Sequence, residues 1–264
     1  MTTAKLGQPI ARGRTAEIYA WGDGQILKLF NAGWHPGWVD YEARVARAVY
    51  ETGAPVPAVG DVIELEGRLG LVYGRVEGPS LLRRIQARPW TFPAAGRLLA
   101  ELHAALHEKR APTLPPQRER LERRISAARP LTPELRARAL AALQSLPDGD
   151  RLCHGDFHPD NILITARGPV IIDWVDATRG NPLADVARTI VLLTGAIPPM
   201  PGRRLIEALR GKFLAIYRAR YRRLTSAGEQ EIAAWLPVVA AARLDEGIAE
   251  EQERLLALVR QGCS

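Results

Sequence analysis

Residues 153–164 read CHGDFHPDNILI, and this stretch decides the fold predicted for the chain. Asp156 is followed five residues later by Asn161, and the sequence then becomes apolar. Polar side chains beside a buried apolar segment are costly unless they have partners or a chemical task. A second acid, Asp173, ends the next apolar run, GPVIID. Residues 161–173 are therefore expected to form a hairpin that brings Asn161 and Asp173 to one end.

This arrangement suits phosphoryl transfer from ATP. Such chemistry needs a cation on the phosphates, metal ligands, a residue that accepts the proton of the acceptor hydroxyl, and a covering loop. Hard cations such as Mg²⁺ take oxygen ligands, so Asn161 and Asp173 are the candidate metal ligands. Asp156 remains to orient and deprotonate the acceptor. Kinase catalytic loops place Asp and Asn at the same separation, with a metal-binding Asp one hairpin later.

Length and composition indicate a folded globular chain. Its 264 residues, 47% apolar and 25% charged, suit one large domain or two unequal lobes. No apolar run of about 18 residues occurs, and the N-terminal sequence lacks the apolar region of a signal peptide, so no membrane partner is expected. The two cysteines, Cys153 and Cys263, provide no disulfide framework and fit the reducing cytoplasm, which is the predicted location.

The net charge of +7 raises the question of nucleic-acid binding. The arginines, however, alternate with acids along amphipathic stretches such as residues 118–129, RERLERRISAAR, which is typical of solvated helix faces. No nucleic-acid partner is predicted, and steeply salt-dependent retention on DNA would argue otherwise. Lys28 is one of only four lysines, beside 32 arginines, and lies among apolar residues. This exception suggests a site that needs a compact ammonium group.

The first third of the chain reads as β-rich. Two extended runs flank Gly22-Asp23-Gly24, a hairpin signal, and a second hairpin turns at Glu66-Gly67. Between the hairpins, apolar residues recur at helical spacing over residues 35–52. The sequence therefore predicts three strands, one helix and two strands, which form a small antiparallel β N-lobe over residues 1–77.

Helical patterns dominate residues 78–264, the predicted C-lobe, and the fold class is therefore α+β. Two short extended segments, at residues 151–165 and 168–174, interrupt them. The predicted helices cover residues 92–107, 117–128, 133–146, 183–193, 203–224 and 229–260, with Pro237 as a kink in the last.

Several motifs follow one another in the order of a known family. HGDFHPDN (154–161) matches HGDxxxxN, IIDW (171–174) matches ID-[WFY], and GNPLADVA (180–187) matches G-[DN]-P-x-x-D-[LV]-A. Upstream, ARGRTAEIY (11–19) resembles a nucleotide-covering loop, ILKLF (26–30) a strand with a phosphate-binding lysine, and YEAR (41–44) the helix acid that pairs with it. The chain thus resembles the aminoglycoside phosphotransferase and choline kinase family of small-molecule kinases.

The resemblance implies a bilobal protein-kinase-like fold that uses ATP and Mg²⁺. Asp156 would be the catalytic base, and Asn161 and Asp173 would hold the metal. His154 and Asp185 would support the catalytic loop. The nucleotide-binding residues would be Lys28 with its partner Glu42, the covering loop Gly13, Arg14 and Thr15, and the connection Arg75, Val76 and Glu77, whose backbone would bind adenine.

The acceptor is less defined, since the family acts on aminoglycosides, choline, ethanolamine, homoserine, sugars and nucleosides. Acidic groups would favour a cationic acceptor, aromatic faces a quaternary ammonium group, and Arg243 a carboxylate or phosphate. Either tryptophan among the candidates could instead be an ordinary core residue. The candidate lining residues are Asp160, Trp174, Asp176, Trp235, Arg243, Asp245 and Glu246.

Other readings carry less weight. His154 and His158 are four apart, a zinc spacing on a helix, but Gly155 and Pro159 argue against a helix there. Cys153 is expected to be buried and inert. A protein kinase is disfavoured because only eleven residues separate Asp173 from Asp185, which leaves no room for an activation loop.

One alternative function stays open. A catalytically silent nucleotide-binding regulatory protein would bind ATP without turnover, although the expected base, metal ligands and lysine are all present. His103 and His107, one helical turn apart, are expected to have a capping or core role. Nothing in the sequence marks a dimer interface, so the oligomeric state stays open.

Overall fold

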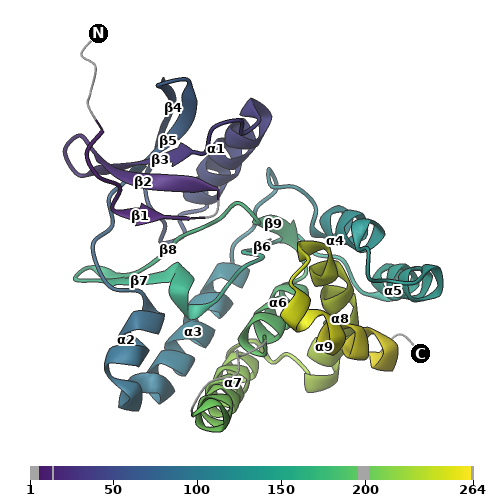
Figure 1. The fold of residues 1–264 in the computed structure, drawn as a ribbon. Helices are drawn as coiled ribbons and strands as arrows, with labels where there is room; N and C mark the ends of the chain where they lie inside the picture. The colour runs from purple at the N-terminus through teal and green to yellow at the C-terminus, as the bar shows by residue number, and fades with distance from the viewer. Residues whose placement is uncertain (1–5, 14, 196–201, 263–264) are drawn as a thin grey trace. The chain divides into compact units, whose positions relative to one another are not determined.

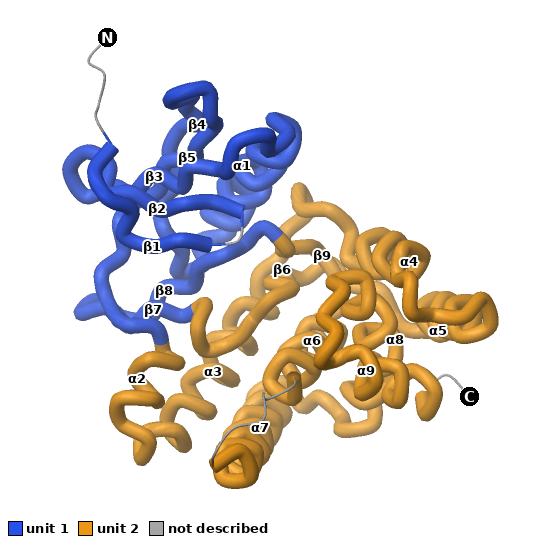
Figure 2. Tube along the Cα trace, in the orientation of Figure 1, with its two compact units in different colours: residues 1–80, 162–175 blue, residues 81–161, 176–264 orange. Residues whose placement is uncertain are grey.

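The computed structural model describes residues 6–13, 15–195 and 202–262. The chain divides into two compact units, shown in separate colours in Figure 2. The first comprises residues 1–80 together with 162–175, and the second comprises residues 81–161 together with 176–264. The first is built on an antiparallel sheet and the second is mainly helical, which confirms the predicted α+β class.

The sheet of the first unit has five strands in the order β1-β2-β3-β5-β4 (Figure 1). Both predicted hairpins are present: Trp21 pairs with Gln25 across the first turn, and Glu66 and Gly67 form the second with φ of 52° and 71°. Positive φ at both central residues is typical of a hairpin turn whose twist matches the right-handed twist of its strands. The elements are β1 (Ala11–Arg12), β2 (Ala16–Trp21), β3 (Gln25–Phe30), α1 (Pro36–Glu51), β4 (Val59–Leu65) and β5 (Arg68–Gly74).

Helix α1 begins where its sequence predicts. The His35 side chain accepts a hydrogen bond from the Gly37 amide. Pro36 occupies the first turn, where a backbone N–H would have no partner within the helix, so its missing N–H costs nothing. Its buried residues Val39 and Ala43 pack with Phe30 of the sheet in one apolar cluster. The helix is therefore fastened to the sheet through the face that also carries Glu42.

A further hairpin belongs to the first unit and confirms the prediction for residues 161–173. It consists of β7 (Ile162–Thr165) and β8 (Gly168–Ile171), with Ile162 paired to Ile171. The Ile171 amide also donates to the carbonyl of Pro55 at 2.7 Å, which ties the hairpin to the rest of the unit. Asn161 and Asp173 therefore lie along the chain just before and just after the same end of this hairpin.

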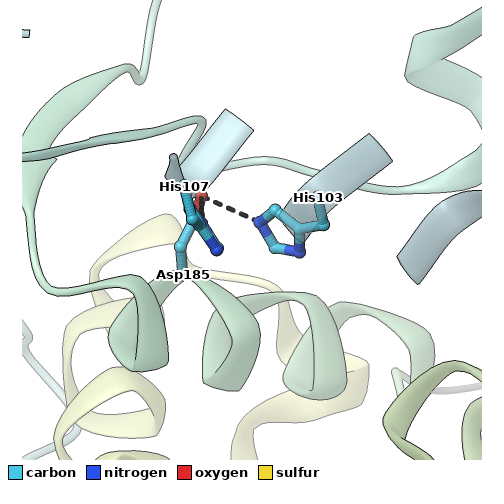
Figure 3. Close-up of side chains that lie close together, drawn as sticks. All are labelled: His103, His107 and Asp185. Atoms are coloured by element: carbon cyan, nitrogen blue, oxygen red, sulfur yellow. Dashed lines mark hydrogen bonds and ion pairs between the residues drawn. The ribbon is translucent and has the colours of Figure 1, made fainter. Parts of the chain in front are cut away.

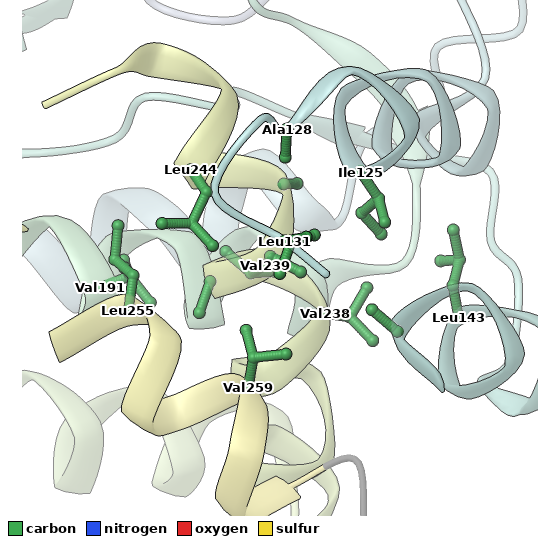
Figure 4. Close-up of a cluster of buried hydrophobic side chains, with 14 of the residues drawn as sticks. Ile125, Ala128, Leu131, Leu143, Val191, Val238, Val239, Leu244, Leu255 and Val259 are labelled. Atoms are coloured by element: carbon green, nitrogen blue, oxygen red, sulfur yellow. The ribbon is translucent and has the colours of Figure 1, made fainter. Parts of the chain in front are cut away.

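The second unit contains an apolar core between several of its helices, which includes Ile125, Leu143, Val191, Val238 and Val259 (Figure 4). The unit also contains a two-stranded antiparallel sheet of β6 and β9. Strand β9 was not predicted, because a segment of three residues is too short to show strand periodicity. The elements are α2 (Leu81–Ala87), η1 (Pro89–Thr91), α3 (Phe92–His107), α4 (Gln117–Ala127), α5 (Pro133–Ser145), β6 (Arg151–Cys153), η2 (Pro159–Asn161), β9 (Thr178–Gly180), α6 (Pro182–Leu193), α7 (Arg203–Thr225), α8 (Glu229–Arg243), η3 (Leu244–Glu246) and α9 (Ala249–Gly262).

The prediction of one long helix over residues 229–260 was wrong. The chain leaves α8 through η3 and turns at Gly247, whose φ of 69° suits a glycine that ends a helix. Pro237 lies inside α8, and a side chain at Gly262 would collide with it, so α9 folds back along α8. The reversal lets both helices bury apolar faces against each other, which one continuous helix could not do.

Within the described ranges, no helix combines the length and apolar character required to cross a lipid bilayer.

Candidate active site

Helix α6 holds the loop at residues 154–157 with three side chains from one helical face. Asp185, Arg188 and Thr189 are spaced at i, i+3 and i+4, so they project in the same direction. Each bonds the loop backbone: His154 N and Gly155 N donate to Asp185 at 2.6 and 2.8 Å, Arg188 donates to Gly155 O at 3.0 Å, and Thr189 to Phe157 O at 2.9 Å. The loop is therefore fixed through its main chain.

Gly155 allows the turn within this loop. Its φ is +80°, a region that side chains disfavour, and a Cβ there would lie 2.5 Å from the carbonyl oxygen of Asp176. The glycine is thus required both by conformation and by close approach.

Asp156 projects from the loop with its carboxylate beside the His158 ring and the Arg188 guanidinium group. Its oxygens lie 3.4 Å from His158 Nε2 and 3.5 Å from Arg188. Burial opposes ionisation, but the hydrogen bond from His158 and the charge of Arg188 outweigh it and lower the pKa of Asp156 to about 2. The carboxylate is therefore ionised at neutral pH.

The Asn161 side chain turns its amide group toward Asp156. Nδ2 donates to the Asp156 carbonyl at 2.9 Å and to its carboxylate at 3.3 Å. Since the amide nitrogen is engaged in this way, the carbonyl oxygen Oδ1 is the atom that remains to accept a bond or ligate a cation.

Asp173, in the first unit, follows β8 in an unusual backbone conformation. Its φ is +66°, which is uncommon for a residue other than glycine and less so for aspartate. The residue is exposed, and no hydrogen bond or ion pair holds its carboxylate among the residues that the structure describes. An exposed acid in a strained conformation is a reasonable metal ligand.

The loop-bracing carboxylate of Asp185 is itself held by a buried network (Figure 3). Nε2 of His103 lies 3.0 Å from Asp185 Oδ2, and Nε2 of His107 lies 3.3 Å from the same atom. Nδ1 of each ring bonds a tyrosine hydroxyl at 2.7 Å, Tyr217 for His103 and Tyr221 for His107. Sequence reasoning gave these histidines only a default core role.

The protonation of this network follows from the contacts. Burial opposes ionisation of Asp185, but the hydrogen bonds from the two histidines hold its pKa well below the usual range. The Asp185 carboxylate is therefore ionised and accepts hydrogen bonds. Each Nε2 must then donate, and each Nδ1 must accept from a tyrosine hydroxyl. The nearest atoms of His103, His107 and Asp185 lie within 4.8 Å of one another, a spacing that a metal could use, but they already bond each other. The cluster reads as structural support.

Acidification is expected to destabilise the fold through His103. Burial, together with the neighbouring His107 ring, lowers the pKa of His103 from 6.5 to about 4, so between these values the unfolded chain binds a proton that the folded chain does not. The free energy of unfolding should therefore fall by up to about 3 kcal/mol as the pH drops through this interval. Urea unfolding of wild type and His103→Gln across the interval tests this, and an equally steep pH dependence in the variant would contradict it.

In the first unit, Lys28 forms a short ion pair with the helix acid. Nζ lies 2.6 Å from Glu42 Oε1, and both side chains are largely buried. The Tyr73 hydroxyl donates to the same oxygen at 3.1 Å, and burial together with the Glu42 charge raises the Tyr73 pKa well above its ordinary value. The lysine side chain is therefore held in one position.

The other predicted nucleotide residues lie at the ends of strands. Gly13 and Thr15 precede β2, and the Gly13 amide donates to the Ala16 carbonyl at 2.9 Å. Arg14 lies outside the described residues. Arg75, Val76 and Glu77 follow β5; the Arg75 amide is bonded to Gly24 O, and its side chain pairs with Glu77 at 3.1 Å.

The candidate acceptor residues separate into three groups. Trp235 lies in the helical core, and Trp174 is buried with its ring nitrogen bonded to Ile171 O at 2.9 Å, so neither offers an open face. Asp160 and Asp245 are exposed. Asp176, Arg243 and Glu246 come together in one charged cluster, together with arginines that sequence reasoning missed.

This cluster surrounds a pocket of the second unit. The pocket lining includes four arginines, Arg120, Arg124, Arg188 and Arg243, and the acids Asp176 and Asp185. The spacing of Arg188 three residues after Asp185, and of Arg120 and Arg124 four residues apart, could have indicated shared helix faces. What sequence could not indicate is that α4, α6 and α8 direct them to one place.

Comparison with known proteins identifies the family of the chain. A family model described as the phosphotransferase enzyme family matches residues 7–235. The chain belongs to this phosphotransferase enzyme family. The resemblance drawn from the motifs at residues 154–161 and 171–174 is thereby confirmed.

Solved phosphotransferases share the fold. A thermostable mutant of aminoglycoside phosphotransferase APH(4)-Ia, in a ternary complex with ADP and hygromycin B, aligns with a TM-score of 0.65 at 19% identity, covering 99% of this chain and 95% of that one. An aminoglycoside-3'-phosphotransferase of type VIII aligns with a TM-score of 0.60 at 21% identity, covering 90% and 92%. At such identities the likeness establishes the phosphotransferase fold alone.

A curated relative is acyl-CoA dehydrogenase family member 10 of Mus musculus, which is 26% identical over 191 residues. The match covers 63% of this chain and 18% of the mouse protein. The phosphotransferase chain thus spans about a fifth of the length of that relative.

Proposed function

We propose that this chain transfers the γ-phosphoryl group of ATP to a hydroxyl group of a small molecule. The observation that carries the proposal is the ionised carboxylate of Asp156, held by His158 and Arg188 on a loop bonded to α6. Family membership supports it, and so does the ADP bound in the ternary complex of APH(4)-Ia.

In the proposed reaction, Asp156 binds and orients the acceptor hydroxyl. The hydroxyl oxygen forms a bond to the γ-phosphorus, the bond from that phosphorus to the β,γ-bridging oxygen breaks, and the hydroxyl proton passes to Asp156. A carboxylate with a pKa of about 2 is a weak base, so orientation contributes more than early proton removal. This suits phosphoryl transfer, whose transition state is loose and demands mainly positioning and charge stabilisation.

Lys28 is assigned to the α- and β-phosphates. Its ion pair with Glu42 and the bond from Tyr73 to the same carboxylate support this role, because they hold the ammonium group in place. The backbone of Gly13, Arg14 and Thr15 is assigned to cover the phosphates. The connection after β5, Arg75 to Glu77, is assigned to adenine; the bonded Arg75 amide favours Val76 and Glu77 as donors.

The residues assigned to Mg²⁺ fit a hard cation. Asn161 offers Oδ1, since its nitrogen is bonded to Asp156, and Asp173 offers an exposed carboxylate. When bound, Mg²⁺ supplies positive charge that neutralises the phosphate oxygens. His154 and Asp185 act through the loop backbone and not on the reactants, so they are positioning residues.

The direct test is ADP release from Mg²⁺-ATP in the presence of a mixed acceptor panel of aminoglycosides, amino alcohols, sugars and nucleosides, with binding of ATP measured in parallel. We expect release that depends on one acceptor class. ATP binding without release for any acceptor would favour the regulatory alternative over an enzyme, and absence of ATP binding would contradict the proposal outright.

A further inference from the structure

The carboxylate of Glu246 is held by arginines from three helices. Its oxygens lie 3.1 Å from Arg124 of α4, 2.6 Å from Arg188 of α6 and 2.8 Å from Arg243 of α8. Guanidinium groups bind carboxylate and phosphate oxygens through paired N–H donors, so such a convergence is a carboxylate-binding site by its chemistry. In this structure an internal side chain occupies it.

This site adjoins the proposed reaction centre. Arg188 contacts Asp156 at 3.5 Å as well as Glu246, and the pocket lined by the arginines also includes Gly155 of the catalytic loop. A molecule whose hydroxyl meets Asp156 would therefore extend toward the guanidinium groups.

The acids of the pocket are poorly suited to a cationic acceptor. Asp185 is fully buried and bonded to two histidines and to the loop amides. Asp176 is paired with both Arg120 and Arg124. An ammonium group would have to break these pairs and would meet guanidinium groups of the same sign.

The cluster as it stands is close to neutral. Four arginines face five carboxylates, those of Asp156, Asp176, Asp185, Glu246 and Glu251, the last paired with Arg243. An anion that entered in addition to these carboxylates would leave the cluster with excess negative charge. An anion that took the place of one carboxylate would not. Glu246 is the carboxylate suited to exchange, because it lies in the short turn η3 beside Gly247 and is partly exposed, while Glu251 is buried.

We infer that the acceptor carries a carboxylate or phosphate group, which Arg124, Arg188 and Arg243 bind in the place taken here by Glu246. The inference rests on the proposed function for the hydroxyl transfer, but the anion site itself does not. It narrows the acceptor to hydroxy acids and phosphorylated alcohols or sugars.

Matched acceptors test the substrate class. Glycerol, glycerate and glycerol 3-phosphate share a hydroxyl-bearing skeleton and differ in the anion, and serine differs from ethanolamine in the same way. We expect ADP release with the anionic members, and the comparison of glycerate with glycerol 3-phosphate distinguishes carboxylate from phosphate. Release with only neutral or cationic acceptors would overturn the inference and leave the kinase proposal intact.

A binding measurement tests the anion site without turnover. Inorganic phosphate is added at constant ionic strength to protein saturated with Mg²⁺-ADP, which blocks the nucleotide site, and thermal stabilisation is recorded. Arg124→Gln should weaken phosphate binding by about 10- to 100-fold, the usual effect of losing a hydrogen bond to a charged group. Arg123→Gln is the matched control, since Arg123 is an exposed neighbour on α4.

Glu246→Gln is expected to change phosphate affinity in the opposite direction. A gain of binding cannot come from misfolding, so this variant keeps the test valid even if Arg124→Gln fails to fold. Removing the internal carboxylate should strengthen phosphate binding, by about tenfold for a competing interaction of about 1.4 kcal/mol. Phosphate stabilisation that Arg124→Gln abolishes and Glu246→Gln enhances would support the anion site even if no acceptor is turned over. No phosphate effect, or equal effects in the Arg123 and Arg124 variants, would overturn it.

Discussion

Replacing Asp156 with Asn is expected to lower acceptor-dependent ADP release by about 10²- to 10⁴-fold, the range that a positioned general base contributes. The reason is that Asn161 and Arg188 both bond the Asp156 carboxylate, so an amide of the same size keeps the shape and loses the charge and the proton acceptor. The measurement is the initial rate of ADP release at saturating Mg²⁺-ATP for both proteins.

The control is Asp148→Asn, an exposed acid of the same unit that has no place in the proposed site. It should leave the rate within about twofold, since surface substitutions away from a site have small effects. ATP affinity should be unchanged in both variants, because the proposed phosphate contacts come from the first unit. An Asp156→Asn protein with wild-type turnover would refute the assigned base.

The second large effect is expected at Asp173. Asp173→Asn should raise the Mg²⁺ concentration needed for half-maximal rate and reduce the rate itself, by about a hundredfold for a loss of about 2.7 kcal/mol of charge stabilisation. Asparagine tolerates the left-handed backbone found at φ +66°, so this replacement tests the ligand and not the turn. The measurement is a Mg²⁺ titration of ADP release at fixed ATP.

Asp61→Asn serves as the comparison, because Asp61 is an exposed acid on β4 of the same unit. It should not move the Mg²⁺ midpoint. If the Asp173 variant showed the wild-type midpoint and rate, the metal would have to be held by other residues.

Much of the fold could be predicted because its signals are local. The turns at residues 22–24 and 66–67 combine glycine with strand periodicity, and the hairpins form there. Helix α3 begins and ends at the predicted residues, 92 and 107, because one apolar face recurs over four turns. The break at Gly247 was missed because Pro237 is the stronger breaker locally, yet packing of α9 on α8 determines where the chain reverses.

The candidate site could be predicted where motif spacing carries it, as at Asp156, Asn161 and Asp185. It could not be predicted where distant helices meet. His103 and Tyr217 are 114 residues apart, and no pattern in the sequence predicts their hydrogen bond or the contact of His103 with Asp185. Likewise, the arginines of 118–129 read as solvated charges until the fold directs Arg120 and Arg124 to Asp176.

The bonds from α6 to the backbone of residues 154–157 have a consequence for motion. A surface loop usually opens on its own, at little free-energy cost, while the helices beneath it stay folded. Here the amides at 154 and 155 and the carbonyls at 155 and 157 are all committed to side chains of one buried helix. The loop and α6 should therefore open together as one cooperative unit, so any flexibility that substrate entry requires must come from other parts of the chain.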